Sequence, residues 1–121
     1  MRHRVKQNLR LNHRDTGHRT AIVRNLVTSF FLHASLITTA KKAMILSQEV
    51  DRIVRIAQSD APEMNKIRSI QSIVFTPDAS RRAMEFAKKM KTRESGFTRV
   101  TPIKYRVGDA AKLVRIEFIH A

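Results

Sequence analysis

The sequence predicts an α+β fold: a two-layer α/β domain whose small sheet is covered by helices, preceded by a basic extended arm. Three observations lead to this prediction. Apolar residues recur at helical spacing in four segments between residues 20 and 90, apolar and polar residues alternate near the C-terminus, and only four apolar residues stand among the first 16. The expected order is helix, short strand, three helices and two strands.

The first helix is predicted where apolar pairs recur every four residues, at Ala21, Ile22, Val23, Leu26, Val27, Phe30 and Phe31. Asp15 or Thr16 can cap its start. The short β-branched segment 35–39 predicts a strand, and Thr38 or Thr39 can then cap a second helix. That helix carries apolar residues three and four positions apart, at Ala43, Leu46, Val50, Ile53 and Ala57.

Two prolines mark the starts of the third and fourth helices. Pro62 and Pro77 stand where a first helical turn tolerates a missing N–H, and each precedes an acidic residue. The third helix presents one apolar stripe, made of Met64, Ile67, Ile70 and Val74. The fourth presents another, made of Ala79, Ala83, Phe86, Ala87 and Met90.

The pattern changes to a period of two after Gly96. Residues 97–107 predict a strand, in which Pro102 marks a bend or bulge and Tyr105 takes a core-like position. Gly108 and the following Asp predict a turn. A second strand follows, in which apolar residues alternate with charged ones at Val114, Ile116 and Phe118. The two strands are expected to pair as an antiparallel hairpin.

The composition points to a polyanionic partner. The 121 residues suit a single domain, and 24 Lys and Arg against 10 Asp and Glu give a formal net charge of +14. The apolar share of 42% allows a small core, so the chain is more than a disordered basic tail. The absence of Cys excludes disulfides and thiolate sites, and no apolar run approaches the length of a membrane span. Nucleic acid is the commonest partner of such a chain.

The positive charge is densest at the N-terminus, where the first 24 residues carry +6. Residues 1–16 are predicted to form a basic arm that a polyanion orders, and residues 17–121 a single domain; a terminus without a role is the alternative. Arginine forks match phosphate oxygens, and histidine adds a planar donor. The expected contact residues are Arg2, His3, Arg4, Lys6, Arg10, Arg14, His18, Arg19 and Arg24. By itself this pattern does not separate RNA from DNA.

A second candidate contact follows the fourth helix, in the segment Ser95-Gly96-Phe97-Thr98-Arg99. Gly96 permits close backbone approach, and Arg99 can hold a phosphate beside Thr98. Phe97 can stack on a base, but we interpret it as a core residue at the entry to a strand.

Metal, cofactor and catalytic sites are not expected. His3, His13 and His18 match no compact metal motif, and the sequence holds neither a phosphate-cradling glycine loop nor a constellation typical of catalysis. The protein is therefore expected to be no enzyme and to bind no small-molecule substrate. A membrane role is least favoured, because the apolar stripes are needed for the core. A DNA-binding or architectural protein is the alternative, although a strand at 35–39 separates the helices that would form a helix-turn-helix.

Blocks at both ends of the chain carry a family resemblance. They are Met1-Arg2-His3-Arg4, His18-Arg19, Arg24-Asn25-Leu26-Val27-Thr28-Ser29, His33, Ile37-Thr38-Thr39, Lys42-Ala43, Gly96-Phe97-Thr98-Arg99, Arg106-Val107-Gly108-Asp109-Ala110-Ala111 and Ile116-Glu117. Each block alone is weak, but together and in order they are specific. On these residues the chain resembles the L-seventeen family of bacterial-type large-subunit ribosomal proteins, from which residues 60–92 diverge.

The resemblance implies a two-layer α/β domain that binds large-subunit rRNA near the outer side of the polypeptide exit region. It also implies contacts with neighbouring large-subunit ribosomal proteins, including the small L-thirty-two protein. The family's RNA-binding arm maps onto the nine contact residues named above, and its glycine-aromatic-Thr-Arg loop onto Gly96, Phe97, Thr98 and Arg99. The expected location is the large ribosomal subunit, in a bacterial cytoplasm or a mitochondrial matrix. A start without a transit peptide favours a bacterial or organelle-encoded chain.

Overall fold

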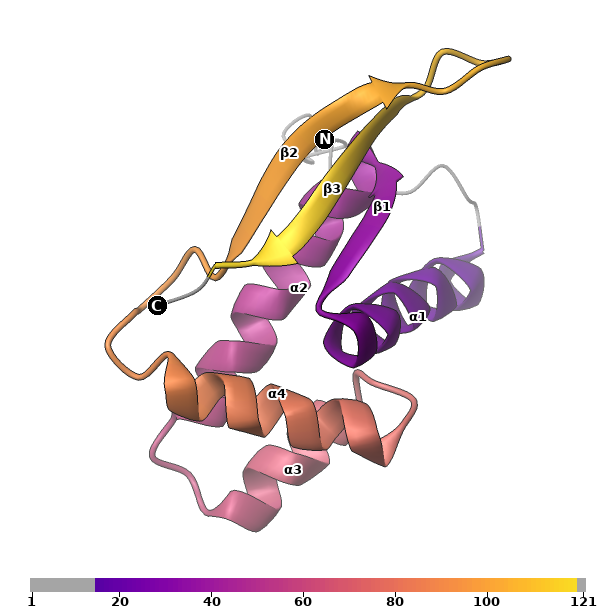
Figure 1. Cartoon of the computed structure of the whole chain (residues 1–121). Coiled ribbons are helices and arrows are strands. Elements are labelled where there is room, and N and C mark those ends of the chain that lie inside the picture. Colours follow the sequence, from indigo (N-terminus) through magenta and orange to yellow (C-terminus); the bar gives the residue numbers. More distant parts are fainter. Residues whose placement is uncertain (1–14, 120–121) are drawn as a thin grey trace, which may run out of the picture.

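The structure, a computed structural model, describes residues 15–119, so most of the expected arm lies outside it. Its elements are α1 (Thr16–His33), β1 (Ser35–Thr39), α2 (Ala40–Gln58), α3 (Glu63–Gln71), α4 (Pro77–Lys89), β2 (Thr98–Tyr105) and β3 (Lys112–Phe118). Figure 1 shows the sheet as one layer with α2 running behind it, and α3 and α4 near one end of the sheet. This arrangement confirms the predicted α+β class and element order.

The three strands form an antiparallel sheet with β3 at its centre, in the order β1-β3-β2. Leu36 of β1 and Val100 of β2 both pair with Ile116 of β3. Residues paired across strands share a face of the sheet, and the full burial of Ile116 shows that this face is turned toward the helices. The predicted hairpin is confirmed, and a register irregularity between Pro102 and Lys104 confirms the expected bulge.

Helix α2 provides the central face of the core. Its buried residues include the whole predicted stripe of Ala43, Leu46, Val50, Ile53 and Ala57. Within the described residues, α2 contacts each of the other helices and all three strands. Its apolar face is therefore the surface on which the domain assembles.

Aromatic rings close the junction between the sheet and helices α1 and α4. The ring centroids of Phe118 and Phe86 are 4.0 Å apart, and those of Phe118 and Phe30 are 4.3 Å apart. Phe97, just before β2, is fully buried and packs edge-on against Phe86. The interpretation of Phe97 as a core residue is therefore confirmed.

Capping residues fix where the helices begin. Asp15 is the N-cap of α1, and its carboxylate accepts a hydrogen bond from Gly17 N at 2.9 Å. Thr39 precedes α2, but its side chain makes no capping hydrogen bond. Pro77 stands in the first turn of α4 as predicted, whereas Pro62 stands one position before α3. The proline signals thus locate helix starts to within one residue.

The far end of the hairpin contradicts one expectation. Tyr105 takes a core-like position in the sequence pattern, yet it is 69% exposed, and Val107 is 96% exposed. The hairpin projects past the end of the helical layer (Figure 1), so no described helix lies under these side chains. The predicted apolar stripe of α3 is only partly buried. Ile70 is the buried residue of this nine-residue helix, and Met64 is exposed.

Replacing Phe97 by Ala removes a fully buried ring and leaves a cavity beside Phe86. We expect the free energy of unfolding to fall by about 3–5 kcal/mol. Tyr105→Ala, which removes an exposed ring, is expected to change it by less than about 0.5 kcal/mol. Urea unfolding followed by circular dichroism measures both variants. Equal losses would contradict the burial of Phe97.

Candidate nucleic-acid interface

The described part of the chain keeps a large excess of positive charge. Five of the 24 Lys and Arg lie at residues 1–14, so residues 15–119 hold 19 of them against all ten Asp and Glu. Three arginines form surface ion pairs, each with a carboxylate three residues away: Arg52–Glu49, Arg81–Asp78 and Arg106–Asp109. Pairs of this kind leave the net charge unchanged and contribute little stability. The surface charge therefore favours a polyanion.

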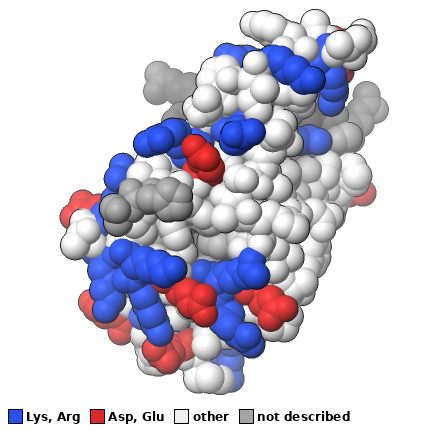
Figure 2. Space-filling view, viewed as in Figure 1, with Lys and Arg blue, Asp and Glu red and all other residues white. Residues whose placement is uncertain are grey.

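Among the described residues, no helix covers the second face of the sheet, and we call this face the outer sheet face. It is formed by the side chains that alternate with the buried ones: Ile37 of β1, Arg99, Thr101 and Lys104 of β2, and Leu113, Arg115 and Glu117 of β3. Figure 2, which views the sheet from this side, shows positive side chains over it, and positive and negative side chains mixed over the helices below. The alternation that buries Ile116 thus places Arg115 in solvent.

The residues of the predicted loop divide into structural and exposed ones. Gly96 has a φ of +70°, a left-handed conformation that glycine adopts at low cost, and Phe97 lies in the core. The hydroxyls of Thr98 and Ser47 are hydrogen-bonded at 2.8 Å, which turns Thr98 toward α2. Arg99 lies exposed on the outer sheet face and is the one member of this loop that presents a charge to solvent.

Six predicted contact residues lie outside the described part of the chain: Arg2, His3, Arg4, Lys6, Arg10 and Arg14. The next two lie at the start of α1, where His18 is exposed and Arg19 is half-buried. Arg19 Nη2 donates a hydrogen bond to Thr16 Oγ1 at 3.1 Å. Both residues therefore follow directly on the arm in the chain and are held on the first turns of a helix.

Arg24, the last predicted contact residue, is turned into the protein. Its Nε donates to Ile73 O and its Nη2 to Val74 O, each at 3.2 Å, and its guanidinium lies 4.1 Å from the centroid of the Phe75 ring. Thr28 Oγ1 donates to Arg24 O at 2.7 Å and accepts from Phe75 N at 3.0 Å. We call this arrangement the Arg24–Thr28 clamp, because it fastens residues 73–75 to α1.

A cleft of about 490 Å³ opens between α1 and α2, and we call it the α1–α2 cleft. Its lining combines three arginines with one carboxylate, hydroxyls and apolar side chains: Thr16, Arg19, Thr20, Val23 and Arg24 of α1, Ile45, Glu49 and Arg52 of α2, and Ser72 and Ile73 after α3. Sequence reasoning missed Arg52. The spacing of residues along α2 does not show which of its turns lies beside α1, so no sequence signal marks this arginine.

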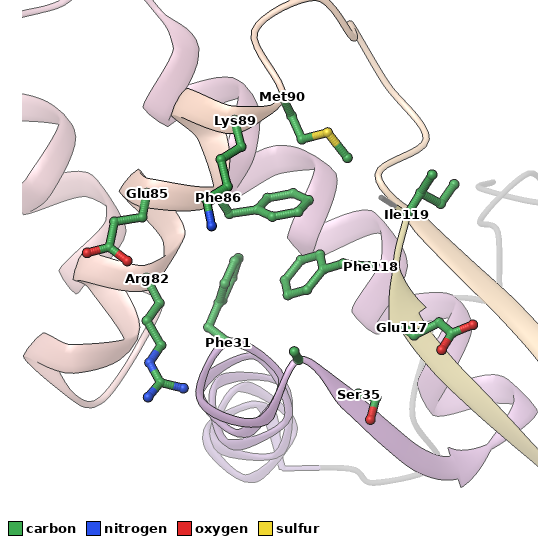
Figure 3. Close-up of a pocket in the computed structure, with 11 residues that line it drawn as sticks. Phe31, Ser35, Arg82, Glu85, Phe86, Lys89, Met90, Glu117, Phe118 and Ile119 are labelled. Atoms are coloured by element: carbon green, nitrogen blue, oxygen red, sulfur yellow. The ribbon is translucent and has the colours of Figure 1, made fainter. Parts of the chain in front are cut away.

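A larger hollow, of about 710 Å³, lies between the end of α1, α4 and the end of β3. Three rings and four charged groups are among its lining residues: Phe31, Phe86, Phe118, Arg82, Lys89, Glu85 and Glu117. Figure 3 shows the three rings gathered together, with Arg82, Glu85 and Glu117 set away from them. Two cations meet two carboxylates here, so the hollow gives a phosphate no electrostatic preference.

An ion pair holds the turn between β2 and β3. Arg106 Nε donates to Asp109 Oδ1 at 3.0 Å, and Ala111 N donates to the same oxygen at 3.2 Å. The hydrogen bond from Arg106, followed by that from Ala111, lowers the pKa of Asp109 to about 2. The Asp109 carboxylate in turn raises the pKa of Arg106. Two residues of the turn have a positive φ, Gly108 at +106° and Ala110 at +55°. The tip of the hairpin is thus fixed by its own residues.

Other kinds of site find no support among residues 15–119. No group of three or more His, Asp and Glu side chains in this range is placed to hold a metal ion. None of the helices described is long and apolar enough to cross a membrane. Strand β1 joins α1 to α2, so these two helices do not form a helix-turn-helix.

Replacing Arg24 by Lys keeps the charge but removes the fork that bonds Ile73 and Val74. We expect the free energy of unfolding to fall by about 1–2 kcal/mol. Hydrogen exchange of the Phe75 amide is expected to accelerate, because the 73–75 segment loosens. Arg55→Lys, at an exposed position of α2, is the matched control and is expected to be neutral. Unchanged stability and exchange in Arg24→Lys would show that the clamp is dispensable.

The acid titration of the hairpin turn follows from the pKa of Asp109. Because this folded pKa of about 2 lies below the ordinary value of 3.8, the ionised carboxylate stabilises the turn above about pH 4, and the contribution is lost as the pH falls toward 2. Carboxyl-carbon NMR is expected to give Asp109 a midpoint near 2, which Arg106→Gln should return toward 3.8. A midpoint near 3.8 in the unmodified protein would mean that the pair does not form in solution.

Comparison with known proteins identifies the family. The family model described as ribosomal protein L17 matches residues 22–119. The large ribosomal subunit protein bL17 of Desulforapulum autotrophicum is 38% identical over 120 residues, which cover 98% of this chain and 97% of the relative. Proteins of the same name from Anaeromyxobacter dehalogenans and Desulfosudis oleivorans are 32% and 35% identical over 98% of this chain, and over 72% and 56% of their own lengths. The chain therefore belongs to the ribosomal protein L17 family and is a structural protein of the large-subunit ribosomal class rather than an enzyme.

Proposed function

We propose that this protein binds large-subunit rRNA as a structural component of the ribosome. The observation that carries the proposal is the excess of 19 Lys and Arg over ten Asp and Glu on residues 15–119 of a chain in a ribosomal protein family. Ribosomal RNA is a folded polyanion whose phosphates repel one another where its segments pack. Cations held on a rigid core lower that repulsion, and the counterions released on binding drive the association.

Two regions are proposed to make the contacts. The first is the arm of residues 1–16, with its five Lys and Arg. The second is the domain of residues 17–121, in which His18 and Arg19 extend the arm onto α1 and Arg99 and Arg115 present forks from neighbouring strands. Gly96 and Thr98 serve this surface by fixing the backbone that leads into Arg99. No step of covalent chemistry is needed.

The placement in the ribosome is proposed from the resemblance. The family resemblance implies a position at the outer side of the polypeptide exit region. The neighbours there would be large-subunit proteins that include the small L-thirty-two protein. The relatives named above come from bacteria, which supports a bacterial cytoplasm over a mitochondrial matrix. Cross-linking of purified large subunits followed by mass spectrometry tests the neighbours. Cross-links to proteins distant from the exit region would contradict this placement.

The arm is tested by replacing its five Lys and Arg at residues 1–14 with Gln, which leaves Asp15 to cap α1. We measure filter binding of the full-length protein to bacterial large-subunit rRNA over a series of KCl concentrations. The slope of log affinity against log salt is expected to flatten by about 0.7–0.9 for each phosphate that the arm no longer neutralises, and so by up to about four units. An unchanged slope would overturn the role of the arm.

A matched control removes the same number of cations from the helices and the loop after α4, at Lys66, Arg68, Arg81, Lys88 and Lys91. These residues lie away from the outer sheet face and the α1–α2 cleft. The control is expected to keep most of the slope, because these side chains are not among the proposed contact residues. Equal flattening in the two variants would mean that total charge, rather than the arm, sets the affinity.

A further inference from the structure

The α1–α2 cleft is a site that neither the family assignment nor the sequence pattern identifies. We propose that it holds one nucleotide of rRNA, with the phosphate between Arg19 and Arg52 and the sugar or base against the apolar floor. The inference rests on the proposed function, which it deepens. It assigns a defined binding pocket in addition to Arg99 and Arg115, which lie exposed on the outer sheet face.

Two arginines of the cleft have partners within its lining. Thr16 Oγ1 accepts from Arg19 Nη2 at 3.1 Å, and the Glu49 carboxylate lies 3.7 Å from Arg52 Nη1. Each of these contacts uses one nitrogen of a group that offers five N–H donors, so a fork remains for a phosphate. Together with Arg24, the cleft carries three cations against the single carboxylate of Glu49. A bound anion therefore gains from the net positive charge of the cleft.

The remaining lining suits the rest of a nucleotide. Val23, Ile45 and Ile73 give the cleft an apolar floor, while the hydroxyls of Thr20 and Ser72 stand with them in the wall. A nucleotide presents a charged group, a hydroxyl-bearing sugar and a flat apolar ring, and so matches all three kinds of surface at once. The volume of about 490 Å³ lies within the range of pockets that enclose small organic groups.

An acidic side chain of a partner protein is the rival occupant, and the cleft favours the nucleotide over it. A carboxylate would satisfy the arginines but leave most of the volume and the apolar floor unfilled. The position along the chain also favours RNA. The cleft begins at Thr16, directly after an arm that holds five Lys and Arg and no carboxylate before Asp15. An RNA strand bound by the arm is therefore led to the cleft.

The absence of cysteine from the chain permits a direct test of occupancy. A single cysteine is placed in the cleft by Thr20→Cys, and in a second protein at an exposed loop position by Thr92→Cys. Each full-length protein is bound to bacterial large-subunit rRNA, and alkylation by N-ethylmaleimide is followed by mass spectrometry. We expect rRNA to suppress alkylation of Thr20→Cys and to leave that of Thr92→Cys at the rate of the free protein.

The charge requirement is tested with the arm intact. Arg19→Gln combined with Arg52→Gln is compared with Arg55→Gln combined with Arg68→Gln, two exposed arginines that do not line the cleft. The first pair is expected to weaken rRNA binding by about tenfold and to flatten the salt slope by about one unit, as expected when one phosphate is no longer bound. The second pair is expected to change the affinity by less than about twofold.

The outcomes separate this inference from the function on which it rests. Full alkylation of Thr20→Cys in a complex that still binds rRNA overturns the cleft site and leaves the proposed function standing. Protection of Thr20→Cys from alkylation in assembled large subunits, but not with rRNA alone, would mean that a polypeptide occupies the cleft. That result overturns the proposal that a nucleotide binds there. Absence of rRNA binding by the unmodified protein overturns both. Equal protection of the two cysteines also overturns the cleft site, because it shows only general coverage.

Discussion

The fold depends on one constraint: a three-stranded sheet is buried on a single face, and α2 is the element that buries it. The stripe of α2 contacts all three strands and the other helices, while Phe30 of α1 and Phe86 of α4 also pack against Phe118 of β3. Because strand side chains alternate, burying Ile116 exposes Arg115, and turning Thr98 toward α2 exposes Arg99. The constraint that makes the core therefore also makes the basic outer sheet face.

The Arg24–Thr28 clamp gives a predicted contact residue a structural role as well. A guanidinium with two of its nitrogens on carbonyl oxygens and its plane beside Phe75 is part of the architecture. Its position still borders the α1–α2 cleft, so the clamp also sets the shape of one cleft wall. Fold and charge are linked at this point: the cation that fastens residues 73–75 to α1 adds to the positive potential that an anion would meet.

Local sequence signals predicted the elements well, because each rests on short-range physics. The helical stripe of α2, the cap at Asp15 and the bulge at Pro102 all depend on residues within a few positions. The exposure of Tyr105 was not predictable in this way, since it depends on how far the hairpin runs beyond the helices. The inward turn of Arg24 and the placing of Arg52 in a cleft likewise depend on how α1 crosses α2, which no local pattern encodes.

The division of charge between arm and domain has a thermodynamic consequence. Arg19, Arg99 and Arg115 stand on elements that core burial has already ordered, so a phosphate contact there requires only the ordering of a side chain. The sequence of the first 16 residues offers four apolar side chains, too few to offset backbone ordering by burial, so contacts there depend on charge. Salt screens phosphate contacts in both regions, and the ordered surface that carries Arg19, Arg99 and Arg115 does not depend on those contacts. In the proposed complex, the domain is thus suited to fix the position of the protein on the RNA, and the arm to add affinity. The α1–α2 cleft lies where the arm joins the domain.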